Sequence, residues 1–304
     1  MSTTDSGDLF HYTGTTGIKG ILSTRKLWAT DIGFLNDTSE GTIPDGILRR
    51  LSKMTVASRL SFYLASKWLA EKSDAIPKSR FFVACFCKHS DLLSQWRGYS
   101  PGLTGYALGF NKEVLKRFAR YRSRCIEASP IIEECIYINE DGYCEIEAKF
   151  RENLSLVEVA FDSNQSPPKG TMFREGIQWL EGPNEAQKRV CEALLNGFWV
   201  SVIEKLERKR PFLKPDAFRE ESETRIVVPA EENLDILWRD NSNNLIPYVE
   251  IDISEVIENG GLKCIVVGPS AHHGRAIRGL EQFLDDKGIP GVQIFSTAAT
   301  FSRH

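Results

Sequence analysis

The chain has 304 residues, of which 41% are hydrophobic and 26% are charged, and its net charge at pH 7 is −3. These values are typical of globular proteins and do not indicate intrinsic disorder, and the small negative charge does not indicate bulk electrostatic binding to nucleic acid or an anionic membrane. Net charge leaves open a local basic patch. The length fits one large domain or two small ones.

Cysteine and histidine usage points to a reducing compartment and gives no metal site. The seven cysteines form no Cys-x-x-Cys pair, and the five histidines do not stand at metal-ligand spacing. We therefore expect free thiols and no bound metal. The N-terminus lacks the basic and apolar regions of a signal peptide, and the apolar runs are too short or too charged to cross a bilayer. These patterns predict a soluble, cytoplasmic protein with no membrane contact.

The first predicted elements are a strand, a helix and a second strand. Leu9 to Thr13 is rich in aromatic and β-branched residues, which favours a strand that Gly14 ends. Thr15 or Thr16 can cap the following helix, in which apolar residues recur at helical spacing. Leu27 to Thr30 is the second predicted strand.

Strands and helices are intermixed along the rest of the chain. Further strands are expected at Phe81 to Cys87, Tyr106 to Phe110, Ile131 to Ile138, Ile246 to Ile253, Cys264 to Val267 and Val292 to Phe295. Helices are expected over Ile43 to Lys72, Ser90 to Trp96, Tyr143 to Phe161, Asn184 to Arg208 and His273 to Lys287, and after a cap at Asn111. The alternation is too irregular for a doubly wound sheet. The predicted fold class is α+β, a single domain over 1–304 with a mostly antiparallel or mixed sheet and helical insertions near 43–72 and 143–208.

A late strand carries two glutamates and an arginine. Strand side chains alternate between faces, so Glu221, Glu223 and Arg225 are expected on one side. Such a face should line water, a cleft or an ion-pair network, because charges are costly to bury alone. In a cleft, one carboxylate could stabilise positive charge on a sugar and the other could take a proton from an attacking group. The alternative is a solvated edge strand in which Arg225 pairs with a glutamate.

The first strand offers a second polar pair. His11 and Thr13 share one face, with Phe10 and Tyr12 on the other. Side by side, just before a tight turn into a helix, His11 and Thr13 can offer hydrogen bonds to a ribose. The alternative is a structural histidine whose hydrogen bonds are satisfied within the protein.

Two further segments could line a binding site. Trp96, Tyr99 and Tyr106 stand among small and turn-forming residues, and aromatic faces stack on flat heterocycles such as a cationic nicotinamide ring. The alternative for Trp96 and Tyr106 is a place in the core, whereas Tyr99 is the better surface candidate. The loop from Phe34 to Asp37, which includes Asn36, is polar around an apolar anchor and predicts either a cleft rim or a helix cap.

As a set, these motifs resemble a widespread bacterial family that is known as a domain of unknown function and is grouped with the ADP-ribosyltransferase-like superfamily. The resemblance covers nearly the whole chain, from about Leu9 to Ser302. The motifs, in order, are His11-Tyr12-Thr13, Leu27-Trp28 with Asp31 and Phe34 to Asp37, Leu93 to Tyr99 with Gly105 to Phe110, Phe218 to Arg225, and Val267-Gly268-Pro269. The fold that the resemblance implies is a split, mixed pair of β-sheets with NAD in the cleft between them.

The resemblance also implies roles for individual residues. His11 matches the histidine that bonds a ribose hydroxyl of NAD, and Tyr12-Thr13 fits the pattern that follows it. Glu223 matches the acid that stabilises the oxocarbenium-like transition state, and Glu221 the acid that engages the acceptor.

The NAD-contacting set that we expect also includes aromatic and polar residues. The Ser-Thr-Ser strand and the paired tyrosines of better-known members are absent, and the aromatic residues of this chain stand in for them. The additional expected contacts are Trp28, Asn36, Trp96, Tyr99, Tyr106 and Arg225.

The function that the resemblance implies is transfer of ADP-ribose from NAD, without a metal, to a macromolecular acceptor, either protein or nucleic acid. Many bacterial relatives of this kind are toxins or phage-defence effectors, a role that brings with it a neutralising partner. Two alternatives remain open: hydrolysis of NAD with water as the acceptor, and a non-enzymatic binding module that keeps the fold.

Overall fold

The computed structural model describes residues 7–35, 41–52, 79–99, 104–123, 126–146, 148–149, 201–240, 244–270 and 272–298. The chain divides into two compact units. The first comprises Met1–Thr38, Arg80–Ile136 and Ala217–His304, and the second comprises Ser39–Ser79 and Tyr137–Asp216. The second unit therefore takes up both segments in which helical insertions were expected.

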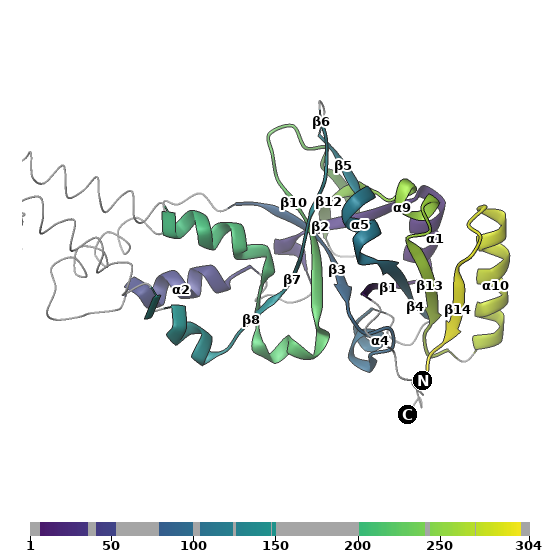
Figure 1. Cartoon of the computed structure of the whole chain (residues 1–304), viewed down its shortest axis with the longest axis horizontal. Helices are drawn as coiled ribbons and strands as arrows, with labels where there is room; N and C mark the ends of the chain where they lie inside the picture. Colours follow the sequence, from purple (N-terminus) through teal and green to yellow (C-terminus); the bar gives the residue numbers. More distant parts are fainter. Residues whose placement is uncertain are drawn as a thin grey trace, which may run out of the picture. The chain divides into compact units, whose positions relative to one another are not determined.

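The first unit is built on one mixed sheet, which twelve strands form among the described residues (Figure 1). The strands are β1 (Asp8–Gly14), β2 (Lys26–Asp31), β3 (Phe81–Cys87), β4 (Gly105–Asn111), β5 (Arg120–Ser123), β6 (Ile126–Ala128), β7 (Ile131–Glu134), β10 (Glu223–Pro229), β11 (Leu237–Asp240), β12 (Leu245–Asp252), β13 (Leu262–Val267) and β14 (Gln293–Ser296). β13 and β14 pair in parallel, and the other pairings are antiparallel. The predicted α+β class with a mixed sheet is confirmed.

Short helices connect the strands of the first unit. They are α1 (Thr15–Thr24), η1 (Ile32–Phe34), α4 (Leu93–Tyr99), α5 (Lys112–Phe118), η4 (Asp216–Glu221, which begins at the unit boundary), α9 (Ser254–Glu258) and α10 (His273–Asp286). α10 runs alongside β14 and β13 at one end of the sheet (Figure 1). Asn111 caps α5 as predicted, because its side-chain oxygen accepts from the amides of Glu113 and Val114.

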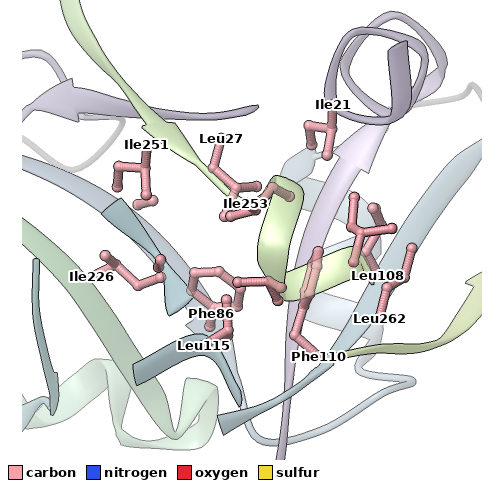
Figure 2. Close-up of a cluster of buried hydrophobic side chains, with 14 of the residues drawn as sticks. Ile21, Leu27, Phe86, Leu108, Phe110, Leu115, Ile226, Ile251, Ile253 and Leu262 are labelled. Atoms are coloured by element: carbon pink, nitrogen blue, oxygen red, sulfur yellow. The ribbon is translucent and has the colours of Figure 1, made fainter. Parts of the chain in front are cut away.

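The larger core cluster of the first unit lies on one face of this sheet. Figure 2 shows Leu27, Phe86, Phe110, Ile226 and Ile251 turned toward one another from five strands. Helices α1, α5, α9 and α10 add apolar side chains to the same cluster. Burial of each such side chain contributes roughly 1.5–3 kcal/mol, so this cluster supplies most of the force that holds the strands together.

The second unit is stabilised by a buried arginine. Its described elements are α2 (Ile43–Ser52), η3 (Arg210–Phe212), a strand pair of β8 (Ile136–Ile138, which begins at the unit boundary) and β9 (Leu213–Pro215), and helical segments at 140–146 and 201–209. Arg210 donates to Glu207 at 2.9 Å and to Asp45 at 3.0 Å. These charge-assisted bonds hold α2 against the end of the helix at 201–209.

Several local predictions need correction. No side chain caps α1: Gly14 is its N-cap residue, and the hydroxyl of Thr15 instead lies 3.5 Å from the Thr104 carbonyl. The predicted strand over Ile131 to Ile138 is broken at Cys135, where the chain changes its pairing partner from β10 to β9. Phe34 does not anchor its loop, because it is exposed.

Three further observations concern the described residues only. None of their helices is long and apolar enough to span a membrane. They contain no His, Cys, Asp or Glu group able to hold a metal ion. Their five cysteines, Cys85, Cys87, Cys135, Cys144 and Cys264, are free thiols.

Candidate functional site

The sheet divides at β3. Every residue of β3 from Phe81 to Cys87 pairs with β10, so β10 occupies one whole edge of that strand. β1 and β2 must share the other edge, where Phe10 pairs with Cys87 and Thr30 pairs with Val83. Between these two contacts β1 and β2 separate into different branches of the sheet. We call this place, around Cys85, the β3 fork.

His11 fills the β3 fork. Its Nδ1 lies 2.9 Å from the carbonyl oxygen of Cys85, between the points where β1 and β2 pair with β3. A carbonyl only accepts, so Nδ1 carries the hydrogen and Nε2 is the acceptor atom of the neutral ring. The ring centroid lies 5.3 Å from that of Phe86. The side chain thus adds a hydrogen bond between β1 and β3 at the branch point.

Burial keeps His11 neutral. The loss of solvation lowers the pKa of His11 from 6.5, although its hydrogen bond to the Cys85 carbonyl acts in the opposite direction. At neutral pH the ring is therefore an uncharged imidazole. Among the described residues, no group hydrogen-bonds Nε2, which can accept from a hydroxyl of a ligand.

Glu223 and Arg225 form a buried ion pair across the strand from the fork. Arg225 donates from Nε to Oε1 of Glu223 at 2.8 Å and from Nη2 to Oε2 at 3.2 Å. The arginine side chain is 0% exposed and the glutamate side chain 5%. β10 pairs with both β3 and β7, so it is an interior strand. The alternative of a solvated edge strand was therefore wrong, although the pairing that it foresaw is present.

The two glutamates approach the thiol of Cys87 from different elements. Glu221 ends η4 and does not belong to β10, so the prediction that it shares a strand face with Glu223 was wrong. The reason is Ser222, whose φ of 42° turns the chain between the two. Burial, together with the nearby carboxylates of Glu221 and Glu223, raises the pKa of Cys87 to about 11.

The predicted residues divide between the two faces of the sheet. Phe10, Cys87 and Glu223 stand in one cross-strand row, so their side chains leave the sheet on the same side. His11 follows Phe10 and lies toward Phe86, which belongs to the core on the other side. The backbones of His11 and Glu223 are thus about two strand spacings apart, roughly 10 Å, with β3 between them.

The face of Glu223 also carries Tyr12 and Trp96, which pack as core residues. The ring of Trp96 lies 4.6 Å from that of Tyr12 and is buried. Its Nε1 donates to Asp91 at 2.7 Å. The Tyr12 hydroxyl donates to the carbonyl of His89 and accepts from the amide of Leu92. Through these hydrogen bonds, both side chains fix the segment from His89 to Leu92, which leads into α4.

The remaining predicted residues lie in different settings. Tyr106 is buried on β4, and Tyr99 is 41% exposed at the end of α4. The hydroxyl of Thr13 is turned toward α1, where it occupies the space that a side chain at Gly17 would need. Asn36 lies outside the described residues.

Trp28 lies on the β2 branch and brings in two residues that the sequence analysis missed. It is 41% exposed and packs on Tyr248 with ring centroids 4.7 Å apart. The guanidinium carbon of Arg239 is 5.6 Å from the Trp28 ring centroid. Alternation along β11 and β12 could have assigned faces to Arg239 and Tyr248, but no local pattern connects those strands to β2.

Comparison with known proteins adds one finding. The chain matches no curated protein and no solved structure. One family does match, over a segment that begins in α4 and ends within β10, so it includes Trp96, Glu223 and Arg225. The expected likeness to a family of unknown function is confirmed over this segment. Residues 95–226 match the family described as "Protein of unknown function (DUF2971)".

Proposed function

We propose that the protein binds NAD at the β3 fork and transfers ADP-ribose to a macromolecular acceptor. The observation that carries this proposal is that His11 and Glu223 flank a single strand where the sheet divides into two branches. Their side chains leave the sheet on opposite faces, so one NAD molecule has to extend past the branch point to reach both. The resemblance implies a split sheet with NAD in the cleft, and the branching of this one sheet at β3 supports the proposal without reproducing a pair of sheets. A neutral His11, whose Nε2 accepts no hydrogen bond from a described residue, suits a ribose hydroxyl, which is a donor.

Each step of the reaction has a candidate group. The bond between nicotinamide and ribose breaks, and nicotinamide leaves with the bonding electrons as a neutral base. Positive charge develops on the ribose, and the carboxylate of Glu223 stabilises it while Arg225 fixes the orientation of that carboxylate. An acceptor nucleophile then bonds to the ribose carbon and gives its proton to Glu221.

The test is release of nicotinamide from NAD by the purified full chain in the presence of a cell extract. Glu223→Asp keeps an anion beside Arg225 but withdraws it by one methylene, and we expect at least a hundredfold slower release, about 2.7 kcal/mol. Glu258→Gln is the matched control, because Glu258 is an exposed partner of Arg25 on α9. Turnover that Glu223→Asp leaves unchanged would remove Glu223 from the mechanism.

A second candidate, a non-enzymatic NAD-binding module, is favoured by one observation. Both carboxylate oxygens of Glu223 are engaged by Arg225, and the side chain is almost fully buried. Titration calorimetry with NAD distinguishes the two candidates, since binding without nicotinamide release supports the module. Hydrolysis of NAD, the third alternative, would give free ADP-ribose and no labelled macromolecule.

A further inference from the structure

The β2 branch of the sheet has an outer face with an aromatic and cationic surface. The core side of this branch is apolar, with Leu27, Ala29, Val249 and Ile251 buried. Side chains alternate along each strand, so Trp28 and Tyr248 leave the sheet on the opposite side. These two aromatic residues are therefore not part of that core.

Arg239 lies on this outer face, and not all of its hydrogen-bond donors have a partner. Its Nη2 donates to the hydroxyl of Thr30 at 2.8 Å, and its Nε is buried without a hydrogen-bond partner. Within the part of the chain that the structure describes, no carboxylate lies within ion-pair distance of it. The loss of solvation lowers the pKa of this arginine. A desolvated cation of this kind is unfavourable by itself and is stabilised by a bound anion.

The neighbouring charges do not oppose an anion. Glu250 pairs with Trp28 across the strands, but its carboxylate is held by Lys26 in an ion pair. This ion pair adds no net charge to the face. Asp252 pairs with Lys26 across the strands, at the end of the face away from Arg239.

We propose that the exposed side of Trp28 and the guanidinium of Arg239, packed against the buried side chains of Tyr248 and Thr30, form a binding site for a nucleoside monophosphate. The exposed part of the Trp28 ring takes the base, since base–aromatic stacking contributes roughly 1–3 kcal/mol. The guanidinium of Arg239, which the Thr30 hydroxyl orients, takes the phosphate with charge-assisted hydrogen bonds. A nucleoside monophosphate carries both a flat ring for Trp28 and an anion for Arg239.

The site does not depend on turnover of NAD. If the protein binds a nucleoside monophosphate at Trp28 but releases no nicotinamide from NAD, this inference stands and the proposed function is wrong. If the protein releases nicotinamide but substitutions at Trp28 and Arg239 do not change its affinity for the nucleotide, the proposed function stands and this inference is wrong.

Titration calorimetry of the full chain with AMP tests the site. Adenosine, which lacks the phosphate, should bind about tenfold to a hundredfold more weakly than AMP. Trp28→Ala and Arg239→Gln should each weaken AMP binding about tenfold or more, and Arg239→Lys should lie between wild type and Arg239→Gln. Trp238→Ala is the matched control, because Trp238 is 60% exposed and leaves β11 on the opposite face. Thermal melts establish that each variant is folded.

Three results would overturn the proposal. AMP could fail to bind the wild-type chain. It could bind the folded Trp28→Ala and Arg239→Gln variants as tightly as wild type. Trp238→Ala could weaken it as much as Trp28→Ala does.

Discussion

Arg225 holds both carboxylate oxygens of Glu223 from two residues along the same strand, and neither side chain is more than 5% exposed. Two opposite charges are thus buried together in the middle of a sheet. An isolated buried charge is far less stable than a matched pair. The free energy of unfolding should therefore depend mainly on whether both charges of the pair are present or both absent. It should depend less on the size or polarity of either side chain.

Removing one member of this pair should destabilise the protein strongly. We expect Arg225→Met to lower the free energy of unfolding by about 3–5 kcal/mol, because the buried carboxylate of Glu223 loses both charge-assisted hydrogen bonds from Arg225. The double variant Arg225→Met with Glu223→Leu should recover much of that loss. Urea denaturation measures both. A single variant that loses less than about 1 kcal/mol, or a double variant no more stable than the single, contradicts this account.

The titration of His11 should make stability depend on pH. The folded-state pKa of His11 is lower than its ordinary value of 6.5, so below pH 6.5 the unfolded chain takes up the proton first. The contribution of His11 is complete above pH 6.5 and is lost as the pH falls toward the folded-state pKa.

His11→Asn should separate this effect from other titrations. Its side-chain amide keeps a donor for the Cys85 carbonyl but does not titrate. Melting temperatures from pH 4.5 to 8 should fall less steeply below pH 6.5 in the variant than in wild type. Parallel curves for the two proteins would count against a depressed pKa at His11.

Two glycines provide a matched test of packing. A Cβ at Gly268 would lie 2.8 Å from the buried ring of Trp96, so Gly268→Ala should cost about 1–3 kcal/mol. Gly279, on α10, has open space at the same position, and Gly279→Ala should add about 0.5–1 kcal/mol through helix propensity. Thermal and urea unfolding measure both changes. Equal effects of the two substitutions would show that Trp96 adjusts without loss.

The turn before β10 should favour glycine. Ser222 has a φ of 42°, a left-handed conformation that disfavours residues with a side chain by roughly 1–2 kcal/mol. Ser222→Gly relieves this but makes the unfolded chain more flexible, so we expect a net gain below about 1 kcal/mol. Ser222→Val should instead lose more than about 1 kcal/mol. Denaturant midpoints for the two variants check this order, and the reverse order would contradict it.

Local patterns were enough to predict the elements that hold the site. The apolar run at β3, the aromatic strand β1 and the cap at Asn111 all follow from interactions between near neighbours in sequence. The face shared by Glu223 and Arg225 also followed from alternation along a strand. These features do not depend on which strand pairs with which.

The fork and the outer surface could not be predicted, because they depend on pairing between distant segments. Nothing near His11 in sequence indicates that its ring lies beside the backbone carbonyl of Cys85. Arg239 reaches Thr30 only because β12 lies between β11 and β2. The prediction placed Glu221 on the strand with Glu223, but the left-handed backbone of Ser222 turns the chain, so Glu221 ends η4 instead.

The pairing of β3 with β10 has a consequence for how the chain folds during synthesis. β10 follows the whole of the second unit in sequence. One edge of β3 therefore has no β10 to pair with until the ribosome has passed residue 229. Until then β3 presents unsatisfied backbone groups, which in a nascent chain invite association with other strands. Contacts between segments so far apart in sequence also form slowly. The first unit should therefore mature only after translation is nearly complete, and it should depend on chaperones more than its size alone would suggest.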